Sequence, residues 1–267
     1  MAGAGRLYIS IVELQFMGKN GFIPSKSWFT VVEMEICTHC NRKCSYCPAS
    51  ILQTIEPPKY MSDEVFDRLL NELRKINFFG RISYNIFNEP LLRNDLERFV
   101  ARIKETLPDS YQLLFTNGDF LSEERYRSLK EAGINHFRVT MHSFTPIPER
   151  PLQTIQYPTD INLNNCGGTL SKLNEPLDQP CFGPSEMLIV TSTGNVLLCC
   201  NDGTKNQIMG NLMKRSLEEI WFSKKFIWIR KLLKNGRRCE GPTICRNCDA
   251  TNFVLPGKGY NDPQNWV

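Results

Sequence analysis

Four cysteines within eleven residues near the start of the chain give the sequence its clearest chemical signal. Three of them, Cys40, Cys44 and Cys47, have the spacing C-x3-C-x2-C. Thiolates bind iron–sulfur clusters and zinc well, and a short loop brings three sulfurs together at little entropic cost. Three thiolates can hold three irons of a [4Fe–4S] cube and leave the fourth iron without a protein ligand. That iron can bind a substrate or a cosubstrate.

Zinc is the alternative for this loop, because Cys37/Cys40 and Cys44/Cys47 are each a C-x2-C half-site. The two pairs are three residues apart, whereas zinc modules usually separate them by about a dozen residues or more. The spacing therefore favours an iron–sulfur cluster. Cys37 lies outside the three-cysteine pattern, and we expect it to be a small buried residue that ends the preceding strand.

The loop resembles that of the radical S-adenosylmethionine (SAM) enzymes. Thr38, Asn41, Tyr46 and Pro48 all match common neighbours of the cysteines in that family. The resemblance implies that the open iron chelates the amino and carboxylate groups of SAM, with Tyr46 at the SAM site. It also implies that an electron from the cluster cleaves SAM to a 5′-deoxyadenosyl radical, which removes a hydrogen atom from the substrate.

After the cysteine loop, strand-like runs alternate with helical patterns. The runs are rich in β-branched and aromatic residues, and the stretches between them repeat apolar residues at helical spacing. This order predicts a parallel sheet with right-handed crossovers and helices on its outside. The predicted strands are residues 28–36, 81–87, 111–115 and 136–141.

Prolines crowd the segment between Met141 and Cys181, and no helix pattern appears there. The segment is too short to complete a barrel, so we expect an α/β fold with a shortened, partial barrel in residues 28–165. Another strand pattern precedes it at residues 6–16. The beginning of the chain would then form a hairpin at the sheet edge, with residues 1–27 as a strand and turn that join the sheet.

Sites in parallel sheets form at the C-terminal ends of the strands. The cysteine loop and three further polar motifs follow predicted strands, so all four should converge on one rim of the sheet. The three motifs are Asn88-Glu89-Pro90, Thr116-Asn117-Gly118 and His142-Ser143.

The first motif resembles the Gly-Gly-Glu element of the radical SAM family. The resemblance implies that Asn88 and Glu89 hold the SAM amino group, with Asn88 in the place of a glycine. Asn117 resembles a family position near the SAM ribose or carboxylate, and Ser143 is a candidate of the same kind. The alternative for these residues is a role in a turn or at a helix end. We assign His142 no ligand role.

A second set of cysteines surrounds a predicted β-hairpin in the last third of the chain. Two strand-like runs flank the turn Ser192-Thr-Gly-Asn195. The hairpin and its cysteines resemble the SPASM/twitch extension of radical SAM enzymes, which we expect in residues 166–267. The alternative is a zinc ribbon with four cysteine ligands. The resemblance implies one auxiliary [4Fe–4S] cluster, ligated by Cys181, Cys199, Cys245 and Cys248.

Composition narrows the class of protein. The chain has 267 residues, 41% hydrophobic and 22% charged, as is ordinary for a globular protein. Its net charge is +4, and the sequence has no Lys/Arg block, so nucleic acid is not an expected partner. No apolar run reaches the length of a membrane span, so a membrane is not an expected partner either. The absence of a signal-peptide pattern, with eleven cysteines, indicates the cytoplasm. The mild basic excess suits an acidic electron donor such as a flavodoxin or ferredoxin.

An auxiliary cluster with four protein ligands cannot chelate substrate, but it can accept or pass on an electron. This suits a two-electron oxidation, in which the substrate loses a hydrogen atom, a proton and an electron. By size and cysteine spacing, the chain resembles aminocyclitol dehydrogenases of aminoglycoside biosynthesis. The resemblance implies oxidation of a carbinol carbon of a small molecule, a sugar or an aminocyclitol, to a ketone in natural-product biosynthesis.

Three alternatives stay open. The first is an epimerase, which would need a thiol to return a hydrogen atom, and Cys166, beside two glycines, is a spare thiol in a suitable segment. The second is modification of a ribosomal peptide, which SPASM enzymes often carry out. The third is a non-catalytic zinc-binding interaction module, which the polar motifs at the strand ends argue against.

Overall fold

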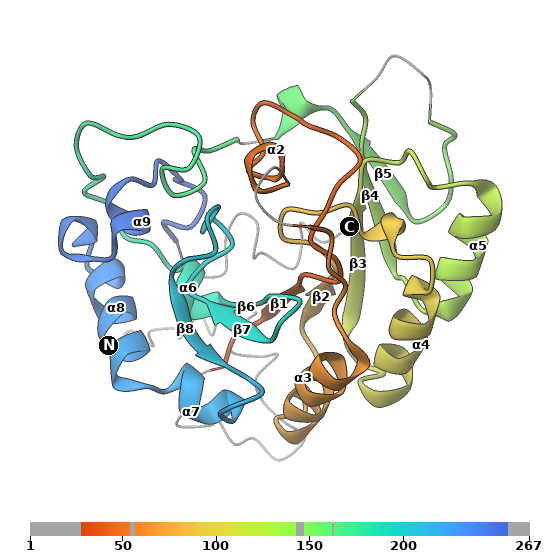
Figure 1. Ribbon diagram of the computed structural model, residues 1–267, viewed down its shortest axis with the longest axis horizontal. Helices are drawn as coiled ribbons and strands as arrows, with labels where there is room; N and C mark the ends of the chain where they lie inside the picture. The colour runs from red at the N-terminus through yellow and green to blue at the C-terminus, as the bar shows by residue number, and fades with distance from the viewer. Residues whose placement is uncertain (1–27, 54–56, 143–146, 162, 256–267) are drawn as a thin grey trace, which may run out of the picture.

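The computed structural model describes residues 28–53, 57–142, 147–161 and 163–255. Its strands form one eight-stranded sheet (Figure 1) in the order β5-β4-β3-β2-β1-β6-β7-β8. The first six strands in that order pair in parallel, and the remaining pairs are antiparallel. The predicted α/β fold with a partial barrel is confirmed. The strands are β1 (Val31–Met34), β2 (Arg81–Ser83), β3 (Tyr111–Thr116), β4 (His136–Thr140), β5 (Gln153–Gln156), β6 (Met187–Val190), β7 (Asn195–Leu197) and β8 (Ile208–Asn211).

Four of the described helices begin at serine N-caps. Ser62, Ser122 and Ser223 each accept a hydrogen bond from the backbone N–H three residues ahead. Ser216 and Glu219 form a capping box, as the pattern Ser-x-x-Glu indicates. The α-helices are α2 (Ala49–Leu52), α3 (Asp63–Lys75), α4 (Leu96–Thr106), α5 (Glu123–Ala132), α6 (Gly183–Glu186), α7 (Leu217–Trp221), α8 (Lys224–Lys234) and α9 (Thr243–Arg246). Short 3-10 helices span Pro90–Leu92, Pro158–Asp160 and Arg238–Glu240.

β1 lies in the interior of the sheet, between β2 and β6. All of its residues are buried, and the N–H of Glu35 extends the pairing with a 2.8 Å hydrogen bond to the Val190 carbonyl. The expectation that the start of the chain adds a hairpin to the sheet edge is wrong for this strand, because it has pairing partners on both sides. The predicted strand at residues 6–16, and the whole predicted N-terminal segment of residues 1–27, lie outside the described residues.

β5 is a parallel strand that the sequence pattern did not predict. It pairs with β4, and its four residues are only half-buried. Prolines are tolerated next to such an edge strand, because one of its sides makes no ladder hydrogen bonds. The proline-rich segment after β4 therefore extends the partial barrel by one strand.

The predicted hairpin of the second cysteine set is present, and it continues the same sheet. β6 pairs in parallel with β1 over four residues, and β7 returns antiparallel beside β6. The cysteine loop follows the C-terminal end of β1. The open end of the β6–β7 hairpin, next to Cys181 and Cys199, lies at the other end of this strand pair. Such a strand is roughly 13 Å long, which separates the two cysteine sets.

The sheet buries apolar side chains on both faces, because successive residues of a strand point to opposite sides. On the outer face, Val32 and Leu188 belong to a core that includes residues of α3, α4, α5, α7 and α8. In Figure 1, α3, α4 and α5 lie beside β2 to β5, and α7, α8 and α9 lie toward β6 to β8. On the inner face, one smaller core joins the strands to the last cysteine segment: Val31, Met187, Ile189, Leu197, Cys248, Ala250 and Phe253.

Candidate active site

The cysteine loop leaves β1 and ends where α2 begins. The thiols of Cys40, Cys44 and Cys47 are partly exposed, and burial raises the pKa of Cys47 to about 11. The backbone N–H of Arg42 lies 3.4 Å from the Cys40 sulfur, and the Asn117 amide nitrogen lies 3.8 Å from it. N–H groups that point at a sulfur stabilise the thiolate that an iron site needs. Cys37 is fully buried, as predicted.

Asp119 anchors this loop to the end of β3. Its carboxylate accepts two hydrogen bonds from the Arg42 guanidinium, at 2.6 and 2.7 Å, and one from the Asn41 amide at 2.6 Å. The Asn41 oxygen in turn accepts a 2.8 Å hydrogen bond from Asn117. Such bidentate, charge-assisted pairs fix geometry as well as adding energy. Asp119 and Arg42 were not predicted from the sequence, although Asp119 directly follows the Thr116-Asn117-Gly118 motif at a strand end.

Glu89 joins the ends of β2 and β3. Its carboxylate accepts hydrogen bonds from the Thr116 hydroxyl (2.7 Å), the Asn117 N–H (2.8 Å) and the Leu91 N–H (3.0 Å). The residue is 2% exposed, and this burial raises the pKa of the Glu89 carboxyl to about 7. A carboxylate offers about four acceptor positions, so three protein donors leave room for one more donor, such as an ammonium group.

Asn88 makes a local turn. Its amide oxygen accepts a 2.8 Å hydrogen bond from the Ile86 N–H, and its nitrogen donates to the Tyr84 carbonyl at 3.1 Å. The nitrogen also lies 3.5 Å from the Cys37 sulfur. The Asn88 side chain therefore stabilises the backbone that presents Glu89.

Tyr46 lies next to the end of β4. Its hydroxyl is 2.7 Å from Nδ1 of His142, and the two rings stack with their centroids 6.1 Å apart. His142 Nδ1 is also 3.8 Å from the Cys44 sulfur. His142, to which the sequence analysis gave no ligand role, is thus paired with the cysteine loop. Ser143, the other predicted residue here, lies outside the described residues.

The four predicted auxiliary cysteines line one cavity. Cys181, Cys199, Cys245 and Cys248 surround it together with Pro184, Asn201, Leu233, Arg238 and Ile244. The Cys200 sulfur instead lies 3.9 Å from the Met187 sulfur, and Cys239 is exposed. Within the described ranges, no three His, Cys, Asp or Glu side chains are grouped around a single ion position.

The chemistry of this cavity fits an iron–sulfur cluster. Asn201 directs its N–H at the Cys199 sulfur (3.5 Å) and its amide nitrogen at the Cys248 sulfur (3.8 Å). Burial raises the pKa of Cys181 and Cys248, and the nearby Arg238 guanidinium opposes this rise. Arg238 is 1% exposed and donates hydrogen bonds to backbone carbonyls around the cavity, including that of Cys248. Buried thiols with N–H donors and a fixed cation suit a negatively charged group.

Cys166 lies between the two cysteine sets. It is 9% exposed and packs with Ala49 and Phe87 in a small core that also touches Cys40 and Cys47. The thiolates of Cys47, Cys248 and Cys199 are near enough to add to the effect of burial, which raises the pKa of Cys166 to about 12. The spare thiol is therefore close to the cysteine loop, as its predicted role requires.

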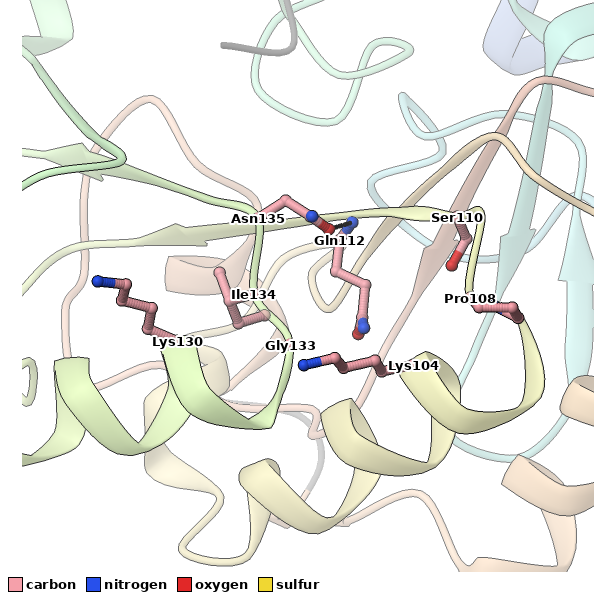
Figure 2. Close-up of a pocket in the computed structure, with 8 residues that line it drawn as sticks. All are labelled: Lys104, Pro108, Ser110, Gln112, Lys130, Gly133, Ile134 and Asn135. Carbon is pink, nitrogen blue, oxygen red and sulfur yellow. Dashed lines mark hydrogen bonds between the residues drawn. The ribbon is translucent and has the colours of Figure 1, made fainter.

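A separate pocket of about 160 Å³ lies away from this site, among the residues shown in Figure 2. It is lined by Lys104 and Lys130 and by residues at the N-terminal ends of β3 and β4. The cysteine loop contacts the opposite ends of these strands. The polar side chains in it are paired internally: Ser110 donates to the Leu107 carbonyl, and Gln112 donates to that of Val100.

Comparison with known protein families matches two consecutive regions of the chain. Residues 34–161 match the radical SAM superfamily, and residues 181–249 match SPASM, an iron–sulfur cluster-binding domain. The first region begins at Met34, the last residue of β1, and contains the cysteine loop and β2 to β5. The second contains the cavity formed by the other four cysteines.

The chain is also similar to individual proteins. The chain is 34% identical over 234 residues to an S-adenosyl-L-methionine-dependent 2-deoxy-scyllo-inosamine dehydrogenase of Niallia circulans, covering 83% of this chain and 93% of the relative. The crystal structure of BtrN in complex with AdoMet and 2-DOIA superposes with a TM-score of 0.76 at 32% identity, covering 86% of this chain and 96% of that one. A GTP 3′,8-cyclase of Aquifex aeolicus is 29% identical over 43% of this chain and 36% of its own length.

Among the described residues, no helix combines the length and apolar character needed to cross a bilayer.

The matched cysteine loop implies SAM with a [4Fe–4S] cluster, and the matched second region implies an auxiliary cluster, so the predicted cofactors are confirmed. The chain belongs to the radical SAM superfamily and is an oxidoreductase of that superfamily with a C-terminal SPASM domain.

Proposed function

We propose that this enzyme oxidises a secondary alcohol of an aminocyclitol, or of a closely related sugar, to a ketone in natural-product biosynthesis. The likeness to the Niallia circulans dehydrogenase over nearly the full length of both chains supports this substrate class. The observation that carries the proposal is the second thiol-lined cavity, packed on the same sheet as the cysteine loop. A dehydrogenase needs such an electron-accepting site, because its substrate loses an electron after losing a hydrogen atom.

Different residues of the chain have different roles in the proposed reaction. The thiolates of Cys40, Cys44 and Cys47 would hold the first cluster, and Arg42 with Asp119 fixes their loop. When bound, SAM and this cluster supply the 5′-deoxyadenosyl radical. The chain keeps the radical away from water and orients the substrate alcohol toward it.

We infer that SAM binds along the rim formed by the predicted residues. Glu89 would accept a hydrogen bond from an N–H of the SAM amino group, on a turn that Asn88 shapes. Asn117, which lies beside the Cys40 sulfur, would contact the SAM ribose or carboxylate. Tyr46 would border the site with His142 behind it, and Ser143 remains a candidate from the sequence.

Replacement of Glu89 by Gln tests this placement. The raised pKa of Glu89 keeps the carboxyl neutral below about pH 7, whereas the N–H donors of the SAM amino group prefer the carboxylate. Affinity of the wild type for SAM should therefore rise as the pH increases through 7 and then level off. E89Q should weaken SAM binding roughly tenfold or more, the loss of a charged hydrogen bond, and should remove the pH dependence.

Isothermal titration of the anaerobic, cluster-loaded protein at several pH values measures this effect. The matched control is Glu72→Gln, which changes another buried glutamate that bonds to Lys75 and the Leu217 N–H. A pH profile of E89Q that matches those of the wild type and E72Q would refute the role of Glu89.

Epimerisation is the second candidate, because Cys166 belongs to the small core against which Cys40 and Cys47 pack. Mass spectrometry with an aminocyclitol substrate separates the two reactions. The dehydrogenase proposal predicts a product lighter by two hydrogen atoms, formed in step with 5′-deoxyadenosine, by both the wild type and Cys166→Ala. A product of unchanged mass and altered retention, abolished in C166A while SAM cleavage persists, would establish the epimerase instead.

We also infer that the electron donor is an acidic carrier of the flavodoxin or ferredoxin type, and that the protein works in the cytoplasm. The exposed face of α8 carries Lys224, Lys225 and Lys231 around Trp228, which is 53% exposed. The helix contains no acidic residue. Its buried residue Leu233 lines the auxiliary cavity. A basic surface with an aromatic centre, one helix away from a redox site, complements an acidic carrier.

Charge reversal tests this surface. The double variant Lys224→Glu/Lys231→Glu should raise the KM for a reduced flavodoxin roughly tenfold at low ionic strength, and added salt should shrink the difference. Turnover with dithionite should not change, because that reductant needs no docking surface. The control Lys104→Glu/Lys130→Glu makes the same charge change at the pocket of Figure 2. Equal effects of the two double variants would contradict docking on α8.

A further inference from the structure

The loop of residues 165–169 contacts the cysteine loop, the Cys199 segment and the segment of Cys245 and Cys248. It follows the partial barrel in the chain and precedes the second cysteine set by a dozen residues. On one side it reaches the cysteine loop: Cys166 forms a small core with Ala49 and Phe87, and Cys40 and Cys47 pack against this core. Gly203 extends this contact. It lies so close to Thr169 and Pro48 that a side chain at this position would collide with both.

On its other side, the loop is bonded to the segment that carries Cys248. The backbone N–H of Asn165 donates to the Asp249 carboxylate at 2.7 Å, and its amide nitrogen donates to the Asn247 carbonyl at 2.6 Å. The Asn165 oxygen accepts from the N–H groups of Asp249 (3.3 Å) and Gly168 (3.2 Å). Asn165 is 2% exposed. One buried side chain therefore binds the loop to both neighbours of an auxiliary cysteine.

The backbone of this loop has an uncommon conformation. Cys166, Gly167 and Gly168 have φ values of 50°, 65° and 86°, all in the left-handed region. A Cβ on Gly167 would lie 2.7 Å from the Asn201 carbonyl oxygen, and one on Gly168 would lie 2.5 Å from the Asn247 Cβ. The glycines thus allow a close approach to both auxiliary segments, and Cys166 accepts backbone strain that a glycine would avoid.

We propose that residues 165–169 set the distance between the SAM-binding cluster and the auxiliary cluster, with Asn165 as the positioning residue. This inference rests on the proposed function, in which an electron leaves the substrate for the auxiliary site. The pairing of β1 with β6 fixes the two cysteine sets along the strands, and the loop fixes them across the inner face of the sheet.

As a consequence, the loop couples the two halves of the reaction, which are SAM cleavage and electron transfer to the auxiliary cluster. If the loop is displaced, the cysteine loop and its cluster still cleave SAM. The auxiliary site then lies farther from the substrate carbon, so fewer cleavages end in a ketone. The distance between the two clusters should therefore affect the yield of ketone per 5′-deoxyadenosine more than the rate of SAM cleavage.

Two variants displace the loop in different ways. Gly168→Ala forces it off Asn247, and Asn165→Asp keeps the acceptor oxygen but replaces the donor to the Asn247 carbonyl with a repelling oxygen. The matched control is Gly236→Ala, which changes a glycine with a similar φ of 74° whose added Cβ would meet only ordinary contacts, 3.5 Å or longer. The control carries the same backbone strain without moving the loop.

The decisive readout is the magnetic interaction between the two clusters, measured by pulsed EPR of the dithionite-reduced, fully loaded proteins. G168A and N165D should change this interaction and lower the ketone yield per 5′-deoxyadenosine severalfold, while G236A should match the wild type. Iron and sulfide content shows that each variant holds both clusters. If both variants load fully and keep the wild-type interaction and yield, or if G236A changes them equally, the inference is overturned.

Failure of the proposed function gives a different result. A wild type that cleaves SAM but forms no ketone from any aminocyclitol would refute the dehydrogenase. The EPR measurement needs no substrate, so it would still decide whether the loop sets the spacing. Loss of the auxiliary cluster in G168A alone would leave the decision to N165D, which removes one hydrogen bond and adds no atoms to the backbone.

Discussion

The parallel pairing of β1 with β6 is the constraint on which the rest of the site depends. It makes one continuous sheet of the partial barrel and the SPASM hairpin, so the cysteines of both are held on the same sheet. Glu35, just past β1, strengthens the junction: its buried carboxylate accepts hydrogen bonds from the N–H and hydroxyl of Ser192 and pairs with Lys205. A two-cluster enzyme needs its redox sites at a fixed separation, and hydrogen-bonded strands supply it.

Two carboxylates, the buried Glu89 and the exposed Asp119, organise the rim of the site in a similar way. Glu89 binds the ends of β2 and β3 together, and Asp119 binds the cysteine loop to the residues after β3. Each uses charge-assisted hydrogen bonds, which are directional and strong where water is excluded. Glu89 retains an acceptor position for a ligand, whereas Asp119 is satisfied by the protein. One carboxylate is therefore suited to bind a ligand and the other to support the loop.

Much of the fold and of the candidate site was predictable from local sequence. The cysteine spacings, the capping serines and the polar motifs at strand ends depend on residues close together in the chain, and the structure bears out the motifs' convergence. The order of strands is different, because it depends on which distant segments pair. The interior position of β1 and the joining of β6 to it were therefore not predicted. β5 was missed because prolines flank this short strand on both sides, at Pro151 and Pro158. Asp119 and Arg42 were missed because their pairing spans 77 residues.

The most direct test of this account is EPR of the anaerobically reduced protein with SAM labelled by ¹⁵N at its amino group and ¹⁷O at its carboxylate. The account predicts two [4Fe–4S] signals, of which one gains hyperfine coupling to both labels while the other is unchanged. Substitution of Cys40, Cys44 and Cys47 by alanine should remove only the coupled signal. A protein that binds SAM without coupling to either cluster, or that contains one cluster or zinc in place of two, would contradict it.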